Sequence, residues 1–140
     1  DVAQHFDWVQ AVDREKLITG LSQARRPQQA PRNVLIQVNI SDEDSKSGCL
    51  PDAVLGLAEK IAGLAQLRLR GLMAIPAPWE DSQRRIADIH AMRAQFDLLQ
   101  SDFESVDTLS MGMSDDFELA LREGATMVRI GSALFGARAA

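Results

Sequence analysis

The chain has 140 residues, 46 % of them hydrophobic, and a formal charge of −5, which is the composition of a single globular domain over residues 1–140. One cysteine, Cys49, excludes a disulfide scaffold and a cysteine-based zinc cluster, and suits the reducing cytoplasm in which we expect the protein. The acidic balance argues against nucleic-acid binding, and the absence of a long apolar run or a leader argues against membrane insertion and secretion.

Short apolar segments with the character of strands alternate five times with longer amphipathic segments. The first strand is expected at 6–12 and its helix at about 13–26. A connector rich in proline and glutamine, 27–32, leads to a strand at 33–40 whose apolar density is typical of a parallel strand covered by helices. The next helix begins near Pro51, and its apolar face consists of Val54, Leu57, Ala58, Ile61 and Ala65.

A third strand is expected at 67–75, where the Pro76-Ala77-Pro78 segment ends it. Asp81 or Ser82 can then cap a long helix, because both side chains accept hydrogen bonds from backbone N–H groups of a first turn. Helical spacing gives this helix a buried stripe that consists of Ile86, Ile89, Phe96 and Leu99.

The fourth strand is expected at 108–111, a short helix from about residue 114 or 115 to Glu123 with Gly124 as its stop, and the fifth strand at 126–130. This alternation predicts an α/β protein with a parallel sheet. Both an open doubly wound sheet and a (β/α)₈ barrel fit the pattern. A full barrel takes about 250 residues, so five units cannot close one.

Side chains alternate across a strand, and this divides the expected strands into two faces. Aliphatic residues of the second strand face the helices, which leaves Gln37 and Asn39 on the other face. The same reasoning places Thr108, Ser110 and Arg129 away from the helices. The polar groups of Gln37 and Thr108 can bond to one another in a core, whereas a buried guanidinium such as that of Arg129 requires an acceptor or an anion.

Two segments of small residues, 110–116 and 128–132, each follow an expected strand. Their exposed backbone N–H groups and the hydroxyls of Ser114 and Ser132 are suited to hold a phosphate. Helix capping is the alternative role, with Asp115 and Glu118 spaced as a capping box, and the two roles are compatible.

The remaining polar features give weaker signals. The segment 41–48 is expected to be a solvated loop, with ligand contact by Lys46 as the alternative. His5 and His90 have no partner histidine at metal-ligand spacing, so no metal site is predicted.

Four motifs taken together resemble one family. They are Val38-Asn39-Ile40 with Lys46-Ser47-Gly48, then 70–76 (RGLMAIP), 109–116 (LSMGMSDD) and 128–136 (VRIGSALFG). In this order, and across essentially the whole chain, they resemble the pyridoxal-5′-phosphate (PLP) homeostasis proteins, which are related to the N-terminal domain of alanine racemase.

This resemblance implies a TIM (β/α)₈ barrel of the alanine racemase N-terminal type that holds PLP at its C-terminal mouth. Ser114 and the backbone of Gly131 and Ser132 would hold the phosphate, and Arg129 would address the pyridine nitrogen. Met73 would lie beside the ring and Lys46 near the rim. The full set of implied cofactor-binding residues is Ser114, Arg129, Gly131, Ser132, Met73, Met113, Asn39 and Lys46, with no catalytic residue and no metal.

The chain departs from the family pattern at its start. The family's Schiff-base lysine lies before the region that matches Asp1, and none of Lys16, Lys46 or Lys60 falls at that motif. We therefore expect the C-terminal part of such a barrel, about five βα units without the first three.

Three functions remain open. The first is a protein that binds PLP and delivers it to apo enzymes without a reaction of its own. The second is an amino-acid racemase of the alanine racemase type, although the chain contains no tyrosine to act as the second acid/base. The third is association with a complementary segment or a second copy, because an incomplete barrel exposes sheet edges.

Overall fold

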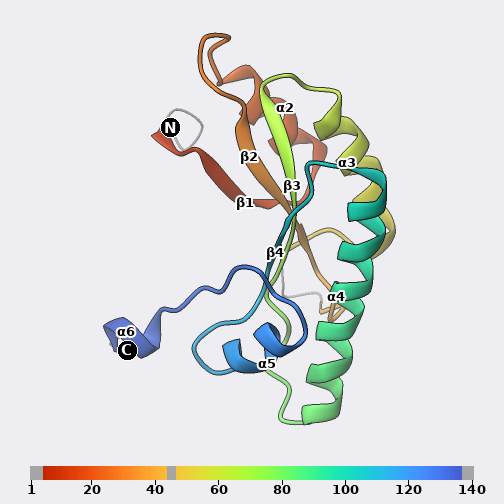
Figure 1. Ribbon diagram of the computed structural model, residues 1–140, viewed down its shortest axis with the longest axis vertical. Coiled ribbons are helices and arrows are strands. Elements are labelled where there is room, and N and C mark those ends of the chain that lie inside the picture. The colour runs from red at the N-terminus through yellow and green to blue at the C-terminus, as the bar shows by residue number, and fades with distance from the viewer. Residues whose placement is uncertain (1–4, 44–46, 137–140) are drawn as a thin grey trace.

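The computed structural model describes residues 5–43 and 47–136. Four strands form one parallel sheet in the order β1-β2-β3-β4 (Figure 1). The strands are β1 (Trp8–Val12), β2 (Arg32–Val38), β3 (Leu67–Ala74) and β4 (Thr108–Ser110). The expected α/β fold with a parallel sheet is confirmed, and each of the first four expected strands is present with slightly shorter bounds.

Three longer helices alternate with the strands: α2 (Glu15–Gln23), α3 (Val54–Ala62) and α4 (Ser82–Asp102). A single 3₁₀ turn, η1 (Pro51–Ala53), precedes α3, and this confirms Pro51 as a first-turn residue. Asp81 caps α4 as predicted, because its side chain accepts a hydrogen bond of 2.8 Å from the backbone N–H of Gln83. Within the described ranges no helix is both long enough and apolar enough to cross a membrane.

Two short helices follow β4, namely α5 (Phe117–Arg122) and α6 (Ser132–Phe135). The capping box predicted for α5 is wrong. The N-cap residue is Asp116, and its carboxylate accepts from the N–H of Met113, which stabilises the preceding turn instead of the helix. The structure ends α3 at Ala62, so Ala65, which was predicted to belong to the apolar face of this helix, lies beyond its end.

The fifth expected strand, 126–130, is also wrong as a strand. Only Met127 forms a bridge, with Ser110 of β4. The carbonyl of Leu109 accepts from the N–H groups of both Thr126 and Met127, and Arg129 N–H then bonds to Gly112. The segment therefore follows the end of β4 through irregular hydrogen bonds, without a continuous ladder.

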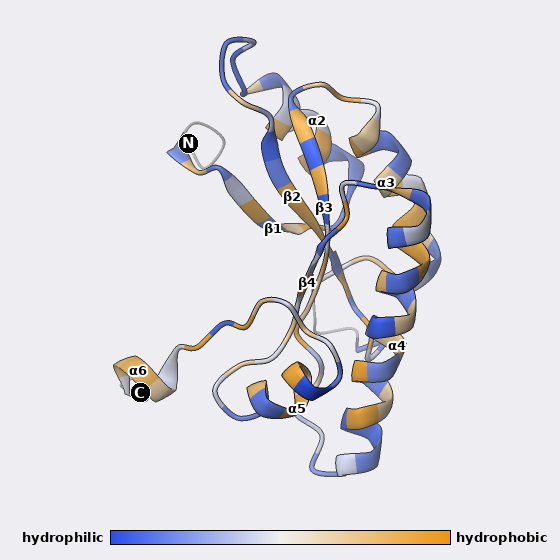
Figure 2. Cartoon of the chain, in the orientation of Figure 1, coloured by the Kyte–Doolittle hydropathy of each residue, from blue (hydrophilic) through white to orange (hydrophobic). Residues whose placement is uncertain are grey.

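The core lies between the helices and one face of the sheet. Helix-facing residues from neighbouring strands, such as Ile36, Leu72 and Leu109, are completely buried. Figure 2 shows hydrophobic segments in β2 and β3 interrupted by hydrophilic ones, and α4 alternates between hydrophilic and hydrophobic residues along its length. The opposite face of the sheet carries the polar residues expected there.

Gly71 fixes the register of β3 against its neighbours. Val34 pairs with Leu69, but the next residue of β2 pairs with Gly71, so one residue is skipped. Gly71 has φ +145°, and a Cβ on it would lie 1.9 Å from the carbonyl oxygen of Thr108. Only glycine fits this close approach, and the resulting register places Met73 opposite Gln37 on one side and Ser110 on the other.

Candidate functional site

Arg129 joins the C-terminal ends of β3 and β4 on the face away from the helices. Its Nη1 donates a hydrogen bond of 2.7 Å to Oγ of Ser110, and its Nη2 donates one of 2.8 Å to the carbonyl of Ala74. Its backbone N–H bonds to the carbonyl of Gly112 at 2.9 Å. The sequence placed Arg129 on this face, and its contacts with β3 and β4 agree with that prediction.

Ser110 links the Arg129 contact to the other edge of the sheet through a second hydrogen bond. Ser110 is completely buried and donates to Oε1 of Gln10 in β1 at 2.7 Å, while it accepts from Arg129. The amide of Gln10 also donates to the sulfur of Met127 at 3.3 Å. Sequence reasoning missed Gln10, although a polar residue in the middle of an apolar strand was an available signal.

Among the residues that the structure describes, none places an anionic group directly on the guanidinium of Arg129. Both of its side-chain acceptors are neutral, and no carboxylate in the described ranges lies within ion-pair distance of it. Burial lowers the pKa of Arg129, and the nearby carboxylate of Asp116 offsets part of that effect. A half-buried guanidinium held on neutral groups is well suited to meet an electron-rich atom of a ligand.

Ser114 brings the two predicted phosphate-binding segments together. Its Oγ accepts from the backbone N–H of Ala133 at 3.1 Å and from that of Gly131 at 3.3 Å. The space beside Gly131 is open, because a Cβ on it would meet nothing within 4 Å. Both N–H groups converge on one oxygen at an open surface, and a phosphate oxygen could take the place of that acceptor.

Other predicted residues lie at different distances from this centre. Met73 is 5 % exposed and pairs with Ser110 in the sheet, so it belongs to the same layer as the arginine contact. Met113 is 42 % exposed and lies next to Ser114 in the loop after β4. Ser132 is the first residue of α6 and is exposed.

Two further predicted residues lie in or next to the loop after β2. The side chain of Asn39 donates to the carbonyl of Glu43 at 2.9 Å and accepts from its N–H at 3.3 Å. Its amide therefore stabilises its own loop, and both of these hydrogen bonds go to Glu43 and not to the groups around Arg129 or Ser114. Lys46 lies outside the described residues.

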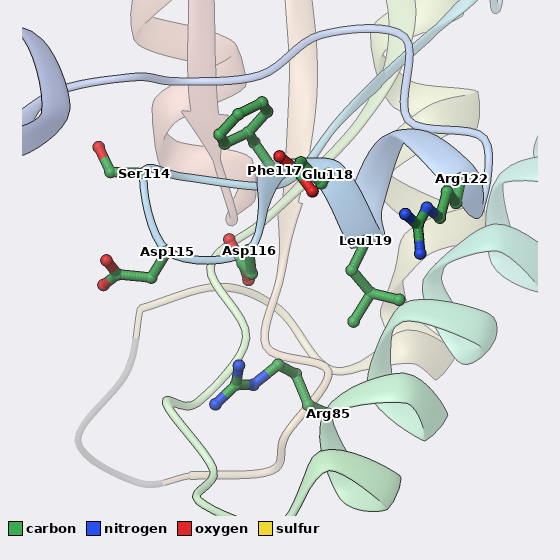
Figure 3. Close-up of a pocket in the computed structure, with 8 residues that line it drawn as sticks. All are labelled: Arg85, Ser114, Asp115, Asp116, Phe117, Glu118, Leu119 and Arg122. Carbon is green, nitrogen blue, oxygen red and sulfur yellow. The ribbon is translucent and has the colours of Figure 1, made fainter.

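We call residues 111–116, between β4 and α5, the Ser114 loop. A cavity of about 320 Å³ lies beside this loop (Figure 3). Its wall includes Asp115 and Asp116 from the loop after β4, and Arg85 of α4 extends toward that loop. From the sequence alone, Asp115 and Asp116 are assigned to the helix cap and to solvent, because their charges would repel a phosphate that they faced. The half-buried position of Asp116, its bond to Met113 and its influence on Arg129 give it a place in the site.

Comparison with known families matches residues 1–139 to the model described as "Alanine racemase, N-terminal domain". The chain belongs to this family. The match to the alanine racemase N-terminal domain family covers almost every residue, and it agrees with the parallel α/β sheet described above.

Relatives within the family confirm the resemblance drawn from the four motifs. Proteins named "Pyridoxal phosphate homeostasis protein" are 51 % identical in Pasteurella multocida and 54 % identical in Pseudomonas aeruginosa, each over 98 % of this chain. The matched region is 60 % and 58 % of their lengths, respectively. The chain thus spans less than two thirds of the relatives that it matches.

Solved structures agree with the sequence relatives. PipY of Synechococcus elongatus with PLP bound has a TM-score of 0.83 at 29 % identity, and covers 96 % of this chain and 63 % of its own. The same protein without PLP has a TM-score of 0.87 at 31 % identity. Alanine racemase from Corynebacterium glutamicum, at 16 % identity and a TM-score of 0.66, shares the fold.

Proposed function

We propose that this chain forms the phosphate- and ring-nitrogen-binding part of a PLP-binding protein that acts in intracellular PLP homeostasis. Relatives that are about 50 % identical to this chain over the matched region carry the name pyridoxal phosphate homeostasis protein, and PipY was solved with PLP bound. The observation that carries the proposal is the half-buried guanidinium of Arg129, which rests on two neutral acceptors next to the Ser114 loop.

The donor set fits both ends of PLP. The N–H groups of Gly131 and Ala133, which donate to Ser114 Oγ in this structure, would turn to phosphate oxygens together with the Ser114 hydroxyl. The guanidinium of Arg129 keeps its proton and donates to the ring nitrogen, so that nitrogen stays unprotonated. PLP supplies an electron sink for amino-acid chemistry when its ring is protonated, and an arginine partner weakens that sink. This pairing suits binding and delivery better than turnover.

We also propose that the four-stranded sheet is part of a (β/α)₈ barrel in a single domain. A parallel sheet covered by helices on one face and carrying polar residues on the other supports this arrangement. Lys60 pairs with Glu15 of α2 in the helix layer, and we therefore do not assign it a bond to PLP.

Equilibrium dialysis with pyridoxamine 5′-phosphate tests the proposal, because this amine cannot bond covalently to a lysine. We expect saturable binding by the chain, and a loss of at least about tenfold in affinity in the Arg129→Ala, Ser114→Ala double variant, as expected for lost hydrogen bonds to charged groups. The matched control is Arg26→Ala, Ser101→Ala, which removes the same residue types from exposed positions. Unchanged binding by the first double variant would refute the assignment of the site.

A further inference from the structure

One carboxylate oxygen joins two loops at the C-terminal end of the sheet. Oδ2 of Asp88, in α4, accepts a hydrogen bond of 2.5 Å from Oγ of Ser41 and one of 2.9 Å from Nε1 of Trp79. Ser41 lies in the loop after β2 and Trp79 in the loop after β3. The Ser41 oxygen also accepts from the N–H of Ala77 at 2.9 Å. We call this set of Ser41, Ala77, Trp79 and Asp88 the Asp88 strap.

The first turns of α4 hold Trp79 at two additional points. The guanidinium carbon of Arg84 lies 4.2 Å from the centre of a Trp79 ring, and Nη2 of Arg85 donates to the Trp79 carbonyl at 2.5 Å. Residues of α4 therefore contact Trp79 at its indole N–H, at its ring face and at its backbone carbonyl. The loop after β3 has one defined position against α4, although it contains two prolines and no regular structure.

This loop forms one wall of the site. Arg129 holds its beginning, through the carbonyl of Ala74, and the strap holds it three residues later at Ala77. Across a cavity of about 110 Å³, residues 76–78 face Met113, Asp115 and Asp116 of the Ser114 loop. Ala74 is the last residue of β3 and pairs with Val38, so only Ile75 and Pro76 separate the acceptor of Arg129 from the N–H that the strap holds at Ala77. A shift of residues 76–78 would therefore pull on the Ala74 carbonyl through this short connection.

We propose that Asp88 is a positioning residue for Arg129, which it reaches through the Asp88 strap and the carbonyl of Ala74. It does not contact the ligand. This inference rests on the proposed function, because the bound ring is what Arg129 would address. Asp88, 14 residues from Ala74 in the sequence, thereby fixes the position of the group that recognises the ring end of the ligand. Recognition of the phosphate end does not depend on it.

The test compares two probes, pyridoxamine 5′-phosphate and inorganic phosphate, on wild type, Asp88→Ala, Asp88→Asn and the control Asp97→Ala. Asp97 lies on the same helix and pairs with Arg93. Asp88→Ala is expected to weaken pyridoxamine 5′-phosphate binding by roughly tenfold, the scale of a lost positioning hydrogen bond, while phosphate binding stays unchanged. Asp88→Asn keeps an acceptor oxygen and is expected to bind like wild type, as is the control.

Trp79 emission reports on the strap itself in a Trp8→Phe background. Asp88→Ala is expected to shift the emission to longer wavelength, whereas Asp88→Asn is not. Trp79→Phe, which retains a ring but not the N–H, provides a milder variant if Asp88→Ala fails to fold, and it is expected to weaken pyridoxamine 5′-phosphate binding selectively.

Each contrary outcome identifies what failed. The inference is overturned if Asp88→Ala and Trp79→Phe bind pyridoxamine 5′-phosphate as tightly as wild type does. It is also overturned if these variants lose affinity for pyridoxamine 5′-phosphate and for inorganic phosphate to the same extent. A wild-type chain that binds neither probe contradicts the proposed function and removes the positioning role with it. In that case the emission shift still shows whether Asp88 holds Trp79.

Discussion

Arg129 and Ser110 are joined by a hydrogen bond of 2.7 Å in which the buried hydroxyl accepts from the guanidinium. The same hydroxyl donates to Gln10 on the opposite edge of the sheet. The charge of Arg129 is thus oriented by a chain of neutral groups that crosses from β4 to β1. A neutral acceptor fixes the direction of a guanidinium without cancelling its charge, which leaves that charge available to a ligand.

Replacement of Ser110 by alanine tests this orientation. The variant removes one acceptor from Arg129 and leaves the amide oxygen of Gln10 without its donor, so we expect a loss of about 1–3 kcal/mol in the free energy of unfolding. Pyridoxamine 5′-phosphate binding should weaken at the same time. Urea denaturation and equilibrium dialysis measure the two effects, with Ser101→Ala as the control. Wild-type values for both quantities would show that Ser110 does not orient the arginine.

Gly71 provides a test of the register that brings Met73, Gln37 and Ser110 into one layer. A Cβ at this position would lie 1.9 Å from the Thr108 carbonyl oxygen in a conformation with φ +145°. Gly71→Ala is therefore expected to cost more than about 3 kcal/mol in unfolding free energy, because backbone atoms must move.

The matched control for this glycine is Gly56→Ala, in the first turn of α3, where a Cβ would meet nothing within 4 Å. That replacement should stabilise the chain by about 0.5–1 kcal/mol, since alanine is the better helix former. Chemical denaturation compares the two. Similar stability for both variants would contradict the close approach of β3 to β4.

Asp107 makes stability depend on pH at the other end of the sheet. Arg70 donates to both of its carboxylate oxygens, and these hydrogen bonds lower the pKa of Asp107 below its ordinary value of 3.8. A depressed pKa means that the unfolded state takes up the proton first. The stabilisation is therefore present above pH 3.8 and is lost as the pH falls toward the lower folded value.

Asp107→Asn should remove this acid-dependent component. Urea denaturation of wild type and variant between pH 5 and pH 2 is the measurement, and we expect the difference between them to shrink as the pH falls. Asp102→Asn serves as the control, since Asp102 is exposed at the end of α4 and has no ion pair among the described residues. A constant difference across this range would show that Asp107 is not the titrating group.

Much of the fold follows from local patterns. Val34, Ile36 and Val38 occupy alternate positions of β2 and make one wholly aliphatic face, and this spacing correctly predicted which face of the strand meets the helices. Pro51 and Asp81 marked helix starts for reasons that act within a few residues. The fifth strand failed because Val128 and Ile130 have the apolar alternation of a strand, while pairing depends on a neighbour that only the tertiary structure supplies.

The site was predictable where glycines, hydroxyls and one arginine lie close together in the sequence. Ser114 and Gly131 were expected to hold the same phosphate; the structure joins the two residues by a hydrogen bond, and their binding of a phosphate stays a prediction. Contacts between distant segments were not predictable in this way. Gln10 lies 100 residues from Ser110, and Ser41 lies 47 residues from Asp88, so neither pair leaves a local signature in the sequence.

Cys49 should be a slow thiol. It is 8 % exposed, and burial raises its pKa to about 11, so little thiolate is present near pH 8. We expect the native chain to react with Ellman's reagent at least about tenfold more slowly than the chain unfolded in guanidinium. Equal rates for the native and unfolded chains would mean that the loop after β2 opens readily at this position.

The central claim is that the Ser114 loop holds a phosphate beside the guanidinium of Arg129. Equilibrium dialysis of the chain against pyridoxamine 5′-phosphate and against pyridoxamine tests it most directly, because the two compounds differ only in the phosphate. The wild-type chain should prefer the phosphorylated compound by more than about tenfold, and Ser114→Ala should reduce that preference. Equal affinity of the wild-type chain for the two compounds would contradict the claim.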